Sequence, residues 1–126
     1  MSAGYTFAAG ALIAIDRDDR RIAVLVGRAI ERGGTITVPA TALAQVIRAP
    51  QRQARLMRFI RRRSTRVVAL DGAVAPRVGR LLATSGTSDI ADAHVVVCAR
   101  HAGQTVITSD AGDLRRLDPT LPVFAL

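Results

Sequence analysis

The sequence predicts a three-layer α/β/α sandwich with a central parallel sheet, formed by a single domain over residues 1–126. Three observations predict this fold. Short apolar segments typical of strands alternate with longer segments whose apolar residues recur at helical spacing. Strands that are separated by helices pair in parallel, and the helices cover both faces of the sheet. The length suits one domain, and a hydrophobic content of 49% excludes an intrinsically disordered chain.

The first half of the chain contains strands at residues 5–8 and 35–38 and four helical segments. A helical turn at 10–15 follows the first strand. The next helix begins after Asp18 or Asp19, either of which can cap it, and ends at the glycine pair 33–34. Pro39 suits the first turn of a helix, because its missing N–H costs nothing there. This third helix runs to a break at Pro50, and a fourth follows at 51–63.

The second half contains strands at 66–70, 105–108 and 122–125. Apolar residues at helical spacing predict a helix at 72–84, and a second helix at 90–102 is capped by Ser88 or Asp89 and stopped by Gly103. A short helix at 110–117 precedes the last strand. The alternation is therefore maintained to the end of the sequence.

Composition also bears on localisation. Cys98 is the only cysteine, which excludes an intramolecular disulfide and is consistent with a reducing compartment. The apolar stretch 7–15 is too short to span a membrane, and no Lys or Arg precedes it to form a signal peptide. We expect a cytoplasmic protein that does not associate with membranes.

Acidic residues are concentrated where a parallel sheet places its ligands, outside the carboxyl ends of the strands. Five of the ten acids lie between 89 and 118: Asp89, Asp92, Asp110, Asp113 and Asp118. Oxygen ligands in this number suit Mg²⁺ or Mn²⁺. The alternative is helix capping, which is open to Asp89, Asp110 and Asp113. No glycine-rich nucleotide fingerprint follows a strand, and a phosphate loop is excluded because the chain has no Lys.

A second arrangement of possible ligands is less convincing. His94, Cys98 and His101 follow one another at i, i+4 and i+7, but three residues on one straight helix rarely converge on one ion. We interpret Cys98 as a small buried residue and His94 as a packing residue with one hydrogen bond.

Four motifs resemble those of PIN-domain nucleases, and most closely the VapC-type ribonuclease toxins of bacterial toxin–antitoxin pairs. The second half of the family is matched by SDIADAH at 88–94 and VITSDAGDL at 106–114. The first half is matched by AGALIA at 9–14, and by VPA at 38–40 with LAQV at 43–46. The order and spacing of the blocks are kept over nearly the whole chain.

The resemblance implies a PIN-like fold and an endoribonuclease whose acidic quartet holds Mg²⁺ or Mn²⁺. The third acid of the quartet falls on Asp92 and the fourth on Asp110, with Asp89 and Asp113 beside them. The first acid falls on Ala8, which cannot bind metal, and the second falls on Gln45, whose amide can still accept a hydrogen bond. Two explanations of Ala8 stay open. One is natural loss of activity; the other, which we favour, is deliberate substitution, because an active toxic nuclease is hard to express.

The net charge of +8 arises from one segment, because residues 48–66 contain eight Arg and no acid. Arg55, Arg58 and Arg62 share one helical spacing, and like charges in such a row destabilise a helix that has no acid nearby. Candidate RNA contacts are Arg48, Arg52, Arg55 and Arg62. A solvated helix face and an antitoxin with acidic patches are the alternatives.

The leading hypothesis is a metal-dependent endoribonuclease toxin, impaired by Ala8, that acts on RNA and is neutralised by a cognate antitoxin. The resemblance also implies a homodimer. The alternative is a catalytically silent RNA- or protein-binding module on the same fold, which Ala8 and Gln45 favour. A phosphoryl-acceptor domain would need a Lys partner, and the chain has none.

Overall fold

A five-stranded parallel sheet forms the centre of the computed structural model, which describes residues 3–126. The strand order is β3-β2-β1-β4-β5, and every neighbouring pair is parallel. The strands are β1 (Tyr5–Phe7), β2 (Ile36–Pro39), β3 (Thr65–Val68), β4 (Thr105–Thr108) and β5 (Val123–Ala125). The predicted fold class is confirmed.

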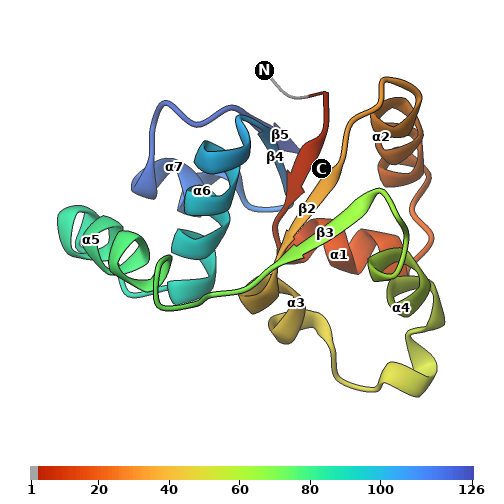
Figure 1. Cartoon of the computed structure of the whole chain (residues 1–126), viewed down its shortest axis with the longest axis horizontal. Coiled ribbons are helices and arrows are strands. Elements are labelled where there is room, and N and C mark those ends of the chain that lie inside the picture. Colours follow the sequence, from red (N-terminus) through yellow and green to blue (C-terminus); the bar gives the residue numbers. More distant parts are fainter. Residues whose placement is uncertain (1–2) are drawn as a thin grey trace.

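Helices cover both faces of this sheet (Figure 1). On one side lie α1 (Ala9–Asp16), α2 (Arg20–Glu31) and α4 (Ala54–Ile60). On the other side α6 (Ile90–Ala102) packs on β1, β2 and β4, with α5 (Ala75–Ser85) and α7 (Ala111–Leu117) against it. The short α3 (Ala40–Val46) contacts both α1 and α6.

Local capping chemistry sets the ends of the helices that the sequence places most closely. The Asp19 carboxylate accepts the Arg21 N–H at 2.8 Å at the start of α2. Helix α6 begins after Asp89 and ends at Gly103, whose φ of 63° lies in the left-handed region that glycine tolerates. Both caps confirm the prediction.

The helix predicted at 51–63 is instead a 3₁₀ turn (Pro50–Arg52) followed by α4. The cause is the Gln53 side chain, which reaches back to the end of α3. Its Oε1 accepts the N–H groups of Arg48 and Ala49 at 2.9 and 3.1 Å, and its Nε2 donates to the Val46 carbonyl at 2.9 Å. These bonds hold the loop against α3 and break the helix at Gln53.

The start of α5 also differs, at Ala75 rather than near residue 72. The Asp71 carboxylate accepts the N–H groups of Ala73 and Val74 at 3.1 and 3.0 Å. This turn satisfies the backbone locally and delays the helix.

The core positions β1 from both sides. Phe7 of β1 stacks on Phe59 of α4 with ring centroids 5.6 Å apart. On the opposite face of the sheet, the buried hydroxyls of Thr6 of β1 and Thr37 of β2 donate to Gln104 Oε1 at 2.9 and 2.7 Å. The central strand is therefore fixed to its neighbours before it reaches the carboxyl edge of the sheet.

The apolar stretch at 7–15 belongs to this core, with Phe7, Ala11 and Leu12 fully buried. Within the described residues, every helix is too short or too polar to cross a bilayer.

Candidate active site

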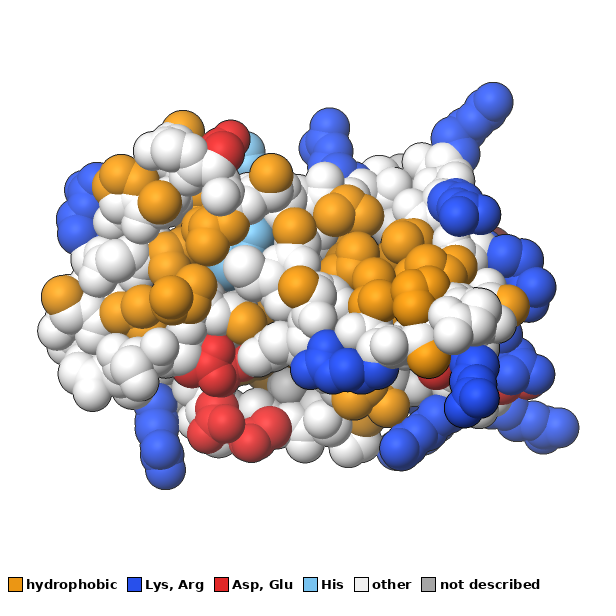
Figure 2. All heavy atoms as spheres, turned by 90° about the horizontal axis from the view of Figure 1, so that it is seen from below, with side chains coloured by type: hydrophobic (Ala, Val, Ile, Leu, Met, Phe, Trp, Pro, Cys, Tyr) orange, Lys and Arg blue, Asp and Glu red, His pale blue; other side chains and the backbone are white. Residues whose placement is uncertain are grey.

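Four carboxylates meet beyond the carboxyl ends of the central strands, and we call them the acid cluster: Asp89, Asp92, Asp110 and Asp113. Asp89 and Asp92 stand at the start of α6, while Asp110 and Asp113 stand where β4 passes into α7. Three of them, all but Asp110, line a cavity of about 270 Å³ that Arg116 and Leu117 also line. Acidic side chains gather at one place on this face of the molecule (Figure 2).

Two of the four are helix caps as well as members of the cluster. Asp89 accepts the N–H of Asp92 at 2.9 Å, and Asp110 accepts the N–H of Asp113 at 3.4 Å. The capping interpretation is thus confirmed for Asp89 and Asp110. Asp113 instead lies in the first turn of α7.

Asp92 has the most perturbed carboxyl of the four. It is half-buried, and this burial, followed by the charges of Asp89, Asp113 and Asp110, raises its pKa to about 6. A hydrogen bond with Asp110 and the charge of Asp110 also raise the pKa of Asp113, although Arg116 partly opposes this. The cluster therefore carries negative charge that nearby cations do not neutralise, and a proton or a metal ion would relieve it.

Close approach of the backbone brings the two halves of this edge together. Gly10 opens α1 directly against Ser109, so that a Cβ on Gly10 would stand 2.0 Å from the Ser109 hydroxyl oxygen. The Ala8 N–H donates to the Ile107 carbonyl at 3.0 Å. The end of β1 is therefore held beside the segment that carries Asp110.

A family model described as PIN domain matches residues 9–118 of this chain. The chain belongs to the PIN-domain family. The prediction made from the four motifs is confirmed.

Solved structures with the same fold include one of VapBC2 and two of Fit proteins. VapBC2 from Rickettsia felis bound to a promoter DNA fragment has a TM-score of 0.73 at 16% identity, covering 98% of each chain. FitAB bound to the IR36 DNA fragment has a TM-score of 0.66 at 14% identity, covering 96% of this chain and 94% of that one. FitAcB from Neisseria gonorrhoeae has a TM-score of 0.64 at 17% identity, covering 95% and 96%. No curated protein matches by sequence.

The acid cluster suits a divalent ion in this PIN domain by ligand type and charge. Even so, no group of three or more His, Cys, Asp or Glu side chains in residues 3–126 is arranged to hold a metal. Ala8, only 5% exposed, stands at the end of β1 and its methyl group offers no ligand atom. Gln45 lies exposed on α3, outside the lining of the 270 Å³ cavity. The acid cluster thus offers oxygen ligands of the type a divalent ion prefers, without the geometry of a formed metal site in the described residues.

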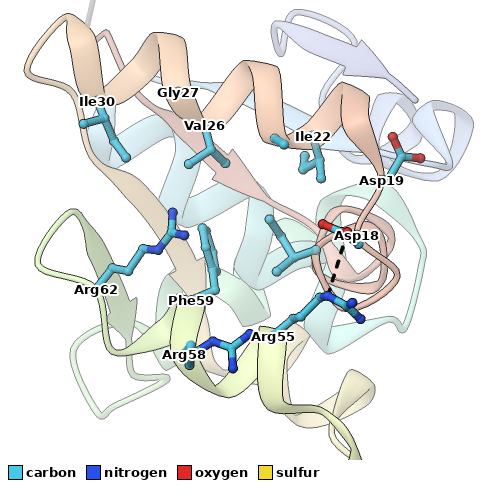
Figure 3. Close-up of a pocket in the computed structure, with 12 residues that line it drawn as sticks. Asp18, Asp19, Ile22, Val26, Gly27, Ile30, Arg55, Arg58, Phe59 and Arg62 are labelled. Carbon is cyan, nitrogen blue, oxygen red and sulfur yellow. Dashed lines mark ion pairs between the residues drawn. The ribbon is translucent and has the colours of Figure 1, made fainter.

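The arginines of segment 48–66 do not form one continuous row. Arg55, Arg58 and Arg62 border a groove of about 340 Å³ between α4 and α2, whose apolar side chains include Ile22 and Phe59 (Figure 3). Arg62 lies past the end of α4, with its guanidinium 5.8 Å from the centre of the Phe59 ring.

The expectation that these arginines have no acid nearby is wrong. The loop between α1 and α2 brings Asp18 and Asp19 to the same groove (Figure 3). The Asp18 carboxylate is 4.0 Å from Arg55 Nε. Arg48 lies elsewhere and donates to the carbonyls of Ala44 and Ile47 at 3.1 and 2.8 Å, while Arg52 is exposed on the 3₁₀ turn.

The histidines and the cysteine of α6 are separated by burial. His94 is fully buried, and its Nδ1 shares a hydrogen bond of 2.7 Å with the Thr41 hydroxyl. Burial lowers the pKa of His94 and raises that of the Cys98 thiol to about 11. His101 is exposed. The interpretation of His94 and Cys98 as packing residues is confirmed.

Sequence reasoning missed Arg116, the basic residue in the lining of the acidic cavity. The signal for it was its spacing, because Arg116 lies three residues after Asp113 and so shares a face of α7 with it.

Proposed function

We propose that this PIN domain is the endoribonuclease toxin of a toxin–antitoxin pair, with Ala8 impairing its activity. PIN domains are generally nucleases, which supports the reaction class. The observation that carries the proposal is the acid cluster, in which burial and the charges of the three other carboxylates raise the pKa of Asp92 to about 6. Such repulsion is costly in a folded chain and is relieved by a bound cation.

Asp92 and Asp110 are the proposed ligands of Mg²⁺ or Mn²⁺, with Asp89 and Asp113 beside them. The ion would supply a Lewis acid for the phosphodiester and lower the pKa of a water molecule. Asp89 and Asp113, which are not the proposed ligands, would be the carboxylates placed to orient a water molecule and accept a proton from it. The Gln45 amide is proposed to hydrogen-bond a water molecule near the site. The methyl of Ala8 leaves one ligand position without a donor.

An antitoxin is the proposed protein partner, and the groove between α2 and α4 supports this (Figure 3). Its apolar part would accept the apolar face of a helix, and Arg55, Arg58 and Arg62 would pair with acids beside that face. The structural neighbours VapBC2 and FitAB are complexes, which agrees with such a partner.

RNA contacts by Arg48, Arg52, Arg55 and Arg62 stay part of the proposal. Arg48 and Arg52 lie outside the groove, so they stay available to phosphates when a protein occupies it. We also propose that the toxin acts in the cytoplasm as a homodimer, for which light scattering should give twice 13.4 kDa.

The test restores the missing carboxylate with Ala8→Asp and uses Ala8→Asn as a control of equal size without charge. We expect Ala8→Asp to bind Mg²⁺ in a calorimetric titration, to gain thermal stability from Mg²⁺, and to cleave a mixed RNA pool. Ala8→Asn should do none of these. Equal Mg²⁺ affinity in the original chain and Ala8→Asp, with no cleavage by either, would overturn the proposal.

The second candidate is a catalytically silent module that binds RNA or protein, and Ala8 with Gln45 favours it. It predicts that Ala8→Asp binds RNA and Mg²⁺ but leaves the RNA intact. Expression of both chains in cells separates the candidates further, because the active toxin predicts growth arrest with Ala8→Asp alone.

A further inference from the structure

A second basic surface lies between α5 and α6, away from segment 48–66. Here a groove of about 580 Å³ is lined by Arg77 and Arg80 of α5 and by Arg100 and His101 of α6. None of its lining residues is acidic. Helices α5, α6 and α7 pack together at one end of the molecule, opposite α2 and α4 (Figure 1).

Most of the positive charge in this groove is free to meet a ligand. Arg77 and Arg80 are exposed, and neither forms an ion pair within residues 3–126. Arg100 Nε does pair with the buried Asp118 carboxylate at 2.9 Å, but half of the Arg100 side chain stays exposed. An arginine fixed through Nε keeps its terminal N–H groups for a second acceptor.

The groove adjoins the acid cluster. Leu117 lines both the groove and the acidic cavity, so the two hollows share a wall. Asp92 and Arg100 stand on the same helix eight residues apart, which is about 12 Å along its axis.

Electrostatics requires such a surface beside the site. The acid cluster repels phosphates, so a strand that reaches it must be held by cations on the flanking nucleotides. Aromatic residues make up 3% of the chain, which leaves few rings for base stacking. The groove therefore suits the backbone of a strand rather than its bases.

We propose that the α5–α6 groove binds the phosphate backbone of the single-stranded RNA whose scissile bond lies at the acid cluster. Arg77 and Arg80 make the principal phosphate contacts, and Arg100 and His101 face them across the groove. The inference rests on the proposed function, because it assigns a path to the same substrate. A neighbouring cavity of about 440 Å³ shares Arg77 and His101 but is also lined by Asp71, so the surface without acidic residues is confined to the α5–α6 groove.

The test compares Arg77→Gln/Arg80→Gln with Arg28→Gln/Arg32→Gln, a control that removes two exposed arginines from the end of α2. Binding of a short, labelled single-stranded RNA of mixed sequence is followed by fluorescence anisotropy over a series of salt concentrations. Chelator is present, so that cleavage cannot affect the result. Circular dichroism melts confirm that both variants fold.

We expect the slope of log affinity against log salt to fall by about 1.4 for Arg77→Gln/Arg80→Gln, because each phosphate contact on a single strand contributes about 0.7. The control should change the slope by less than half of that. Equal slopes in the two variants, with RNA binding by the original chain intact, would overturn the inference and leave the proposed function standing. Failure of the original chain to bind RNA at any salt concentration would overturn both.

Discussion

Replacing Asp92 with Asn should make the protein more stable at neutral pH, and the structure allows the gain to be worked out. The burial of Asp92 and, after it, the neighbouring carboxylates raise its pKa from 3.8 to about 6. A difference of that size corresponds to about 3 kcal/mol of disfavoured charge. Because Asp92 is only half-buried, solvent screening reduces the effect, and we expect Asp92→Asn to gain about 1–2 kcal/mol.

The sign of this effect fixes its pH dependence. A carboxyl whose pKa is raised by folding favours the folded state while it is protonated and opposes it once charged. The advantage of Asp92→Asn should therefore be complete above pH 6, shrink as the pH falls, and vanish below about pH 4. The pKa of Asp92 sets the upper end of this window.

Urea unfolding of both chains at several pH values between 4 and 7.5 measures the difference directly. Glu31→Gln, an exposed acid at the end of α2, is the control and should change stability by less than about 0.5 kcal/mol at every pH. A gain in Asp92→Asn that stayed constant down to pH 4 would refute the reasoning, as would no gain at pH 7.5.

Three further predictions test the packing around the site. Asp118 is buried, and burial itself raises its pKa, but hydrogen bonds including that from Arg100 hold the pKa below 3.8. We therefore expect Asp118→Ala to lower the free energy of unfolding by about 2 kcal/mol, as measured in urea. This loss should shrink as the pH falls below 4. Gly10→Ala should lower the free energy of unfolding by about 1–3 kcal/mol because its Cβ clashes with Ser109. In a double-mutant cycle, Ser109→Gly should recover part of that loss. Additive effects of the two substitutions would show that the residues do not meet. Burial raises the pKa of Cys98 to about 11, so at pH 8 a thiol reagent should react with the folded protein far more slowly than with the chain in urea, and equal rates would contradict the buried position.

The features that the sequence predicts well are those set by neighbouring residues. Helix α6 has the predicted bounds because Asp89 and Gly103 act through local backbone chemistry. Asp110 and Asp113 of the acid cluster are predicted because they follow the carboxyl end of β4, where a parallel sheet places its ligands. The hydrogen bond from Gln53 to the Val46 carbonyl could not be foreseen, because it joins the start of α4 to the end of α3 through a side chain.

The features that the sequence does not predict depend on contacts between residues far apart in the chain. The raised pKa of Asp92 depends on Asp110 and Asp113, which come from a different helix and a different strand end. Segment 48–66 contains no acid, but the fold supplies Asp18 from the loop before α2. The groove with Arg77 and Arg100 is absent from any local charge sum, because it forms only when α5 packs on α6.

The pairing of β1 with β4 has a consequence for how the protein folds. Tyr5 pairs with Thr105, so the two middle strands of the sheet are joined by contacts between residues 100 positions apart. Sheets held together by such distant contacts fold slowly, because the entropy of ordering the intervening chain is lost before the contact contributes to stability. The ribosome adds about 5–20 residues per second, so the edge of β1 that pairs with β4 stays unpaired until β4 has been made. Asp110 follows β4 by two residues, so the acid cluster is assembled only in the last stage of folding. A growing chain on the ribosome would therefore lack the acid cluster until most of it had been made.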